Sequence, residues 1–175
     1  MNPTLPTAKE LEKLPMRAIV AYAARTARRV SQEFRGVVAD ETLDEALRLI
    51  ESVSTTDHIG KIDPAAIFRA SERVVAGYDA APDYLKSTPR FRLLFSLVQA
   101  GLAAAHAVEA VLDPNNAGHQ IKRAALAAER AVRPIQGLNS VAAGAAREAA
   151  RRDYELLFLQ FGEHHQREEK ETRLD

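Results

Sequence analysis

The feature that most constrains this chain of 175 residues is the apolar stretch from Phe91 to Leu112, FRLLFSLVQAGLAAAHAVEAVL. Apolar side chains occur on every side of its helical wheel, and its only formally charged residues are Arg92 and Glu109. A helix that is apolar all round is normally buried inside a protein. The stretch therefore predicts the central helix of a helical bundle.

Proline residues mark both ends of this helix. Thr88 is a suitable N-cap, and Pro89 fits the first helical turn because its missing N–H would have no partner there. Pro114 cannot continue a helix, and it disfavours the helical conformation of the residue before it. We therefore expect the central helix to span about residues 89–112.

The same stretch is long enough to cross a membrane. However, Arg92, His106 and Glu109 lie inside it, and alanine supplies much of its apolar character. A single span without a basic flank on one side would also be poorly anchored. We therefore expect a core helix and no contact with a membrane.

Amphipathic periodicity predicts further helices on both sides of the central one, because apolar residues recur at spacings of three and four. These helices are expected at about residues 8–14, 15–34, 41–54, 64–81, 119–133 and 140–161. No sustained period-two alternation indicates a strand. The expected fold class is all-α: a single-domain bundle of about six or seven helices over residues 1–165, followed by a frayed, charged tail over residues 166–175.

Local signals place several helix boundaries. Thr7 and Glu10 match a capping box at the start of the first helix. Asp40 and Asp63 are suitable N-caps for the third and fourth helices. Pro134 is expected to end or kink the sixth helix.

Charge and cysteine content exclude several classes of protein. The chain has 24 basic and 24 acidic residues, so no global field would attract DNA or an anionic membrane. It has no cysteine, which excludes a disulfide framework, a thiolate metal site and a cysteine nucleophile. The N-terminal segment MNPTLPTAKELEK lacks the apolar core of a signal peptide. These observations predict a cytoplasmic protein.

The segment that opens the second helix, LPMRAIVAYAARTARRV, resembles the start of some uncharacterised bacterial all-helical proteins with an LPxxAxVAxAARxARR pattern. The segment RRDYELL at residues 151–157 extends the resemblance, which otherwise covers about 20 residues. The resemblance implies a bacterial source and a helical fold. It implies no activity and brings no functional residues to this chain.

Familiar catalytic motifs are absent from the sequence, including a phosphate-binding glycine loop, HExxH and G-x-S-x-G. His106 and Glu109 lie one helical turn apart, a spacing that suits a metal site or proton transfer. A metal would need at least two more ligands. We therefore expect a hydrogen-bonded polar core pair, with no metal and no cofactor. A small helical enzyme, or a small-ligand or metal sensor that uses this pair, is the alternative.

Two other segments contain candidate polar groups. Asp57, His58 and Asp63 lie in the longest loop between helices, but no nucleophile or second base is visible near them. Glu163-His164-His165 contains two adjacent imidazoles, which would diverge by about 100° on a helix. We expect no catalysis in the loop and a solvated tail.

The strongest polar feature is the arginine side of the second helix, opposite its apolar stripe. It consists of Arg17, Arg25, Arg28, Arg29 and Arg35. Residues 37–57 hold six acidic residues and one basic residue, and they are expected to pack antiparallel to this helix. Either these charges satisfy one another and water, or the acidic helix neutralises the two ends of the stripe. In the second case Arg25, Arg28 and Arg29 remain open to a partner's carboxylates. Nucleic acid is not expected, because one aromatic residue accompanies the stripe and the acidic neighbour would repel phosphate.

The density of alanine in the second half of the chain predicts close packing of helices, without room for a large pocket. Together with the missing motifs, this favours a non-catalytic helical protein-interaction or regulatory module. Its partner would be another protein or a second copy of the chain. A structural homo-oligomer subunit is the third hypothesis.

Overall fold

Every element of secondary structure is helical in the part of the chain that the computed structural model describes, residues 4–32, 38–80, 82, 90–136 and 141–162. The α-helices there are α1 (Ala8–Leu11), α2 (Met16–Ser31), α3 (Asp40–Thr55), α4 (Pro64–Asp79), α6 (Arg90–Leu112), α7 (Ala117–Gln136) and α8 (Val141–Leu157). Two 3-10 turns, η2 (Ile59–Lys61) and η3 (Pro114–Asn116), and one π-helical turn, η4 (Phe158–Gly162), complete the set. The all-α prediction is confirmed.

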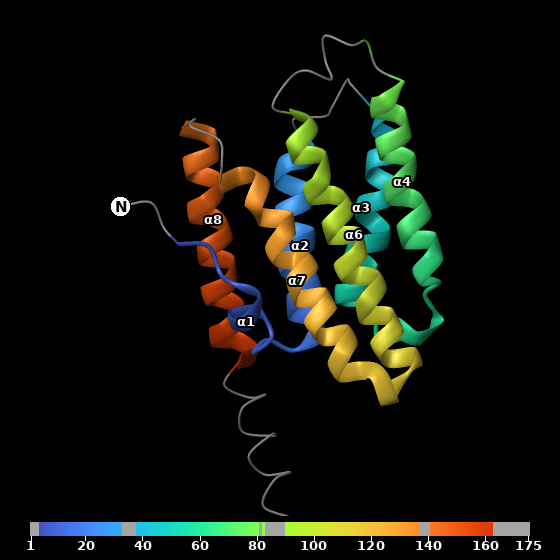
Figure 1. Ribbon diagram of the computed structural model, residues 1–175, viewed down its shortest axis with the longest axis vertical. Helices are drawn as coiled ribbons and strands as arrows, with labels where there is room; N and C mark the ends of the chain where they lie inside the picture. The colour runs from blue at the N-terminus through green and yellow to red at the C-terminus, as the bar shows by residue number, and fades with distance from the viewer. Residues whose placement is uncertain (1–3, 33–37, 81, 83–89, 137–140, 163–175) are drawn as a thin grey trace, which may run out of the picture.

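Helix α6 lies at the centre of the bundle, as its apolar sequence predicts (Figure 1). It packs against α2, α3, α4 and α7. Ala100, Ala103, Ala104 and Ala107 are fully buried. A helix with neighbours on several sides needs no polar face, which explains why its sequence is apolar all round.

By length and composition alone, the 19-residue segment Leu94–Leu112 of α6 would also pass as a membrane-spanning helix. However, 61% of that segment is buried inside the bundle. Core helices of globular proteins meet the same criteria of length and composition. The burial favours the core-helix interpretation.

Small residues allow α6 to approach α4 closely. A Cβ added at Gly101 would lie 2.3 Å from Ser71 Oγ of α4. Ser71 is buried, and its hydroxyl donates a hydrogen bond of 3.1 Å to the carbonyl oxygen of Ile67. A larger residue at position 101 would force the two helices or the Ser71 side chain to move.

Two of the predicted helix caps are present. The Thr7 amide donates to Glu10 Oε2 at 2.8 Å, and the Glu10 amide donates to Thr7 Oγ1 at 3.4 Å, which completes the capping box. The Ala65 amide donates to Asp63 Oδ1 at 2.9 Å at the start of α4.

Two of the helix boundaries differ from their expected positions, and a kink at Pro134 stays a prediction. Asp40 is the first residue of α3, and the N-cap is Ala39. The Asp40 carboxylate still lies in the first turn, where the helix dipole favours negative charge. Pro134 does not end α7, which continues to Gln136. Only two helical residues follow this proline, so the bond that its missing N–H cannot make to the carbonyl of residue 130 is lost near the end of α7 and not in its middle.

Helix α8 lies at the edge of the bundle, beside α2 and α7 (Figure 1). Ala150, Tyr154 and Leu157 of α8 join the same hydrophobic core as residues from α1 to α7. The single domain over residues 1–165 stays a prediction. The predicted tail, residues 166–175, lies outside the described residues.

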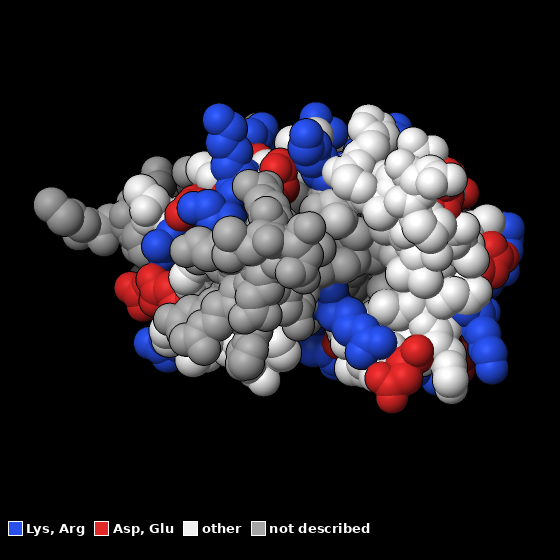
Figure 2. Space-filling view, turned by 90° about the horizontal axis from the view of Figure 1, so that it is seen from below, with Lys and Arg blue, Asp and Glu red and all other residues white. Residues whose placement is uncertain are grey.

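The lower end of the bundle has an uneven distribution of charge. Seen from below, the right-hand part of the molecule shows a broad area without Lys, Arg, Asp or Glu, and charged side chains lie along part of its margin (Figure 2). Val111 and Leu112, the last residues of α6, are 48% and 55% exposed. This end of the molecule therefore presents apolar surface to solvent.

Candidate functional site

The arginines in the middle of α2 are paired with two other helices. Arg28 binds Glu51 of α3 through both sides of its guanidinium group, with Nε–Oε1 at 2.6 Å and Nη2–Oε2 at 2.5 Å. Hydrogen bonding to Glu51 raises the pKa of Arg28. A bidentate pair of this kind fixes the orientation of both side chains.

Arg25 and Arg29 both bind Asp153 of α8. Arg25 Nη1 lies 3.4 Å from Asp153 Oδ1, and Arg29 Nη2 donates to Oδ2. Asp153 is only 9% exposed, whereas the Arg25 side chain remains 47% exposed. The two arginines are four residues apart and therefore share one side of α2. One buried carboxylate thus joins both of them to α8.

These pairs differ from the predicted arrangement. In the second of the two arrangements expected from the sequence, the acidic helix neutralises Arg17 and Arg35 and leaves the middle of the stripe open. Arg17 does pair with a carboxylate, but with Asp57 beyond the end of α3, at 3.3 Å; Arg35 lies outside the described residues. The idea of an open middle is wrong, because α8 supplies Asp153 there. A contact between the middle arginines and a partner remains a prediction.

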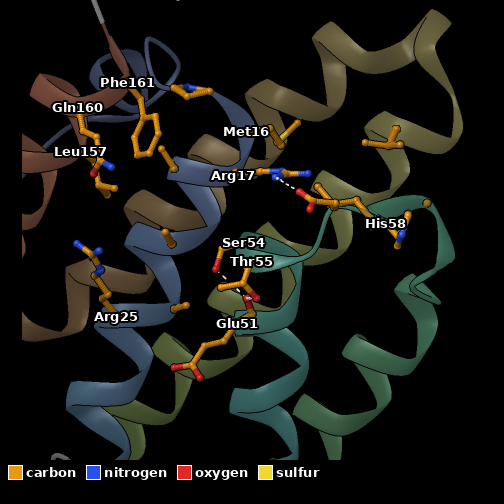
Figure 3. A pocket seen from close by; sticks show the side chains of 18 of the residues that line it. Met16, Arg17, Arg25, Glu51, Ser54, Thr55, His58, Leu157, Gln160 and Phe161 are labelled. Carbon is orange, nitrogen blue, oxygen red and sulfur yellow. Dashed lines mark hydrogen bonds and ion pairs between the residues drawn. The ribbon is translucent and has the colours of Figure 1, made fainter. Parts of the chain in front are cut away.

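A groove of about 1110 Å³ opens between the first half of α2, the end of α3 and η4, and we call it the α2 groove (Figure 3). Its apolar wall contains Met16, Ala21, Ala24, Leu157 and Phe161. The expectation that alanine leaves no room for a large pocket is therefore wrong. Alanine fills little space, so helices pack closely where they touch but leave a hollow where they diverge.

Charged side chains line the rest of the α2 groove. They are Arg17, Arg25, Glu51, Asp57 and Lys61. Both carboxylates are already bound by arginines of α2. Lys61 has no ion pair with any residue in the described part of the chain. The groove therefore has an excess of positive charge.

His106 and Glu109 form the polar pair that their spacing predicts. His106 Nδ1 lies 3.0 Å from Glu109 Oε2, with the two side chains 17% and 42% exposed. Neither residue lines the α2 groove. No group of three or more His, Asp or Glu side chains is placed to hold a metal in the ranges the structure describes. The geometry gives this pair a hydrogen bond, and the described residues supply no third ligand beside it for a metal sensor.

The loop candidates have structural contacts. Asp57 pairs with an arginine of α2, and Asp63 caps α4 and binds Arg69 at 2.8 Å. His58 lines the α2 groove. Glu163-His164-His165 lies outside the described residues.

Sequence reasoning missed two contributors to this site. Asp153 interrupts an arginine-rich segment, but nothing local indicates that its carboxylate faces α2. Phe161 belongs to the apolar cluster YELLFLQF of the last helix, yet its position across from Met16 depends on how α8 packs. Both residues stand out in the sequence, but only the tertiary structure shows which residues they contact.

Comparisons with known protein families, with curated proteins and with solved structures found no match. Function therefore has to be inferred from the geometry of the grooves and the charges around them.

Proposed function

We propose that this chain is a non-catalytic helical protein-interaction or regulatory module, and that its α2 groove receives an amphipathic helix of a protein partner. The observation that carries the proposal is a groove of about 1110 Å³ with an apolar wall and charged margins. Such grooves bind the apolar face of a helix through anchors spaced three and four residues apart. A bacterial, cytoplasmic setting is part of the proposal.

Charge favours an acidic partner helix. Arg25 keeps about half of its surface exposed although it contacts Asp153, and Lys61 is unpaired within the described residues. Glu51 and Asp57 are already bound by arginines. Carboxylates on a partner would therefore meet basic groups that are incompletely neutralised. Charge complementarity of this kind speeds association and selects among partners.

The apolar wall provides anchor points for such a helix. Phe161 of η4 is 39% exposed, and its ring lies beside the first turn of α2, on the opposite side from Met16 (Figure 3). Aromatic residues and methionine are enriched in the buried centres of protein interfaces. The exposed ring of Phe161 would be covered when a helix occupies the groove.

The test uses two synthetic amphipathic helical peptides with the same leucine stripe, one with glutamate and one with lysine on its polar face. Binding is measured by fluorescence anisotropy at low and high salt. We expect the acidic peptide to bind more tightly, and its affinity to fall as salt rises. Ala21→Phe should block binding because it fills the groove, with circular dichroism as the folding control.

A matched pair of lysine variants tests the role of charge. Lys61→Gln should lower the affinity for the acidic peptide roughly two- to fivefold, which is the effect of losing one exposed charge contact. Lys122→Gln removes an exposed lysine of α7 outside the groove and should change nothing. Equal binding of both peptides, or full binding by the Ala21→Phe variant, would contradict the proposal.

A further inference from the structure

A second groove, of about 440 Å³, lies between α4 and α6 and shares none of its described lining residues with the α2 groove. We call it the α4 groove. Its apolar walls are Phe68, Val75 and Ala76 from α4 and Leu94, Phe95 and Val98 from α6. The α4 residues recur at helical spacing and form one stripe that faces α6. The volume lies in the range of about 300–1,000 Å³ that is typical of small-molecule sites.

Two aromatic rings of this groove are accessible to solvent. Phe68 is 38% exposed and Phe95 is 52% exposed. Single exposed apolar side chains are common on protein surfaces, but a cluster of them in one concave region indicates a binding surface. The faces of aromatic rings also carry partial negative charge, which attracts cations.

Among the described residues, the charged groups that line the α4 groove are both acidic. They are Glu72 and Asp79, two turns apart on α4 and both exposed. Neither carboxylate has an ion pair with any residue in the described ranges. This contrasts with the α2 groove, where each lining carboxylate is bound by an arginine.

The arginines of α4 do not neutralise these carboxylates. Arg69 binds Asp63 at 2.8 Å, and Arg73 binds Glu45 of α3 at 3.2 Å. Both guanidinium groups are therefore engaged outside the groove. The described part of the groove combines aromatic surface with uncompensated negative charge.

We propose that the α4 groove binds a small organic cation with an apolar body, such as an aromatic or alkyl ammonium ion. The apolar body would lie against Val75 and Val98, and the cationic group would lie between the aromatic rings and the carboxylates. A neutral molecule of the same shape would lose the charge interaction, and an anion would be repelled. This site is independent of the α2 groove and of the function proposed for it.

The test compares three probes that share a benzyl group. Benzyltrimethylammonium carries a positive charge, neopentylbenzene is its neutral carbon analogue, and phenylmethanesulfonate is negative. Binding is followed in ¹H–¹⁵N spectra through the amides of Val75, Ala76 and Val98. We expect the cation to shift these amides and to bind at least about threefold more tightly than the neutral probe, the effect of a surface cation–aromatic contact.

Matched variants separate the groove from net charge. The double variant Glu72→Gln, Asp79→Asn should lower the affinity for the cation at least about threefold and leave the affinity for the neutral probe unchanged. Glu41→Gln with Glu148→Gln removes two exposed charges elsewhere and should leave the cation's affinity unchanged. Phe95→Leu keeps an apolar wall, and it should lower the affinity for the cation more than the affinity for the neutral probe.

Three results would overturn the proposal. One is equal binding of the cation and its neutral analogue. Another is the same loss of affinity in the groove variant and in the control variant. The third is that a basic amphipathic peptide shifts the amides of the groove and benzyltrimethylammonium does not. That result would assign the groove to a protein partner instead.

Discussion

Helices α4 and α6 pack through small and apolar side chains, whereas α8 is joined to α2 by partly buried ion pairs in addition to apolar contacts. At the first interface Gly101 lies against Ser71 so closely that no Cβ fits between them. At the second, Arg25 and Arg29 converge on the buried carboxylate of Asp153. Close packing depends on residue size at each position, while an ion pair depends on two groups from distant parts of the chain. The two interfaces should therefore respond differently to mutation, salt and pH.

A second ionic contact joins α8 to the N-terminal segment. Arg151 lies 3.5 Å from Glu10 and 2.9 Å from Glu155, and its guanidinium group lies 5.3 Å from the centre of the Tyr154 ring. Hydrogen bonding from the Thr7 amide lowers the pKa of Glu10, and Arg151 adds to this effect. A lowered pKa means that Glu10 stabilises the fold when it is ionised. This contribution is present above the unfolded-state pKa of Glu10 and is lost as the pH falls through the folded-state value.

The largest effect is expected in the apolar core. Leu97 of α6 is 1% exposed, so Leu97→Asp would bury an unpaired charge. The cost of several kcal/mol is comparable with a total stability of about 5–15 kcal/mol, and we expect the variant not to fold. Circular dichroism and NMR dispersion measure the outcome. Leu102 is only partly buried, so Leu102→Asp should be less damaging. A cooperative melt of Leu97→Asp near the wild-type temperature would show that α6 is not the centre of the fold.

Breaking the charged interface should cost less. Asp153→Ala leaves Arg25 and Arg29 without their carboxylate, and Arg29 is the more buried of the two, with 30% of its side chain exposed. We expect a loss of about 2–3 kcal/mol in the free energy of unfolding. Removing one partner of a fully buried pair costs about 3–5 kcal/mol, and the loss should be smaller here because Arg25 is partly exposed to solvent. Urea denaturation measures the loss, and hydrogen exchange should show that α8 opens first.

Glu155→Ala is the control for that loss. Glu155 is 55% exposed and pairs with Arg151, so its removal should cost less than about 1 kcal/mol. If both variants lose the same stability, burial does not distinguish these two ion pairs and the comparison fails.

The closest contact of the apolar interface gives a smaller effect. Gly101→Ala forces a Cβ against Ser71 Oγ, which should cost about 1–3 kcal/mol, partly offset by up to about 1 kcal/mol from the better helix propensity of alanine. Thermal unfolding measures the result. Ser71→Ala should recover part of the loss, because it removes the Oγ at 2.3 Å and keeps the Cβ at 3.2 Å.

Gly118 of α7 is the matched glycine, because a Cβ added there meets nothing within 4 Å. Gly118→Ala should be neutral or slightly stabilising. If Gly101→Ala is as stable as Gly118→Ala, α4 and α6 do not approach each other as closely at Gly101 as the structure shows.

The apolar interface was largely predictable from the sequence, and the charged one was not. The central helix follows from a local pattern, since residues that are apolar on every side of one helix must be buried. Local signals also predicted the caps at Thr7 and Asp63. The pairing of Asp153 with α2 was not predictable, because many carboxylates in the chain can reach an arginine and the packing of α8 decides which one does. The α2 groove was missed for a related reason: alanine indicates close packing only where another helix is present.

The smallest expected effect is at Tyr22 of α2, close to the charged interface, since Asp153 and Arg29 both act on its hydroxyl. This side chain is fully buried, and its hydroxyl has no hydrogen-bond partner among the described residues. A buried hydroxyl without a partner is destabilising. Tyr22→Phe should therefore raise the free energy of unfolding by up to about 1 kcal/mol, in contrast to the loss caused by Asp153→Ala. Urea denaturation at neutral pH measures the difference. Tyr154→Phe is the control, because the Tyr154 hydroxyl donates to the Glu10 carbonyl oxygen at 3.5 Å and its removal should be slightly destabilising.

The pH dependence of Tyr22 provides an independent check. Burial raises the pKa of Tyr22, and the negative charge of Asp153 raises it further. The folded state therefore holds the phenol neutral, and the unfolded state ionises near its ordinary pKa of about 10. The stability that depends on the neutral phenol is fully present below that value and falls as the pH rises above it. Phenylalanine cannot ionise, so the advantage of Tyr22→Phe over the wild type should grow between pH 9 and pH 11. A loss of stability at neutral pH would mean that the Tyr22 hydroxyl has a hydrogen-bond partner in solution. A gap that stays constant between pH 9 and pH 11 would mean that the phenol ionises equally in the folded and unfolded states, and so that it is not buried.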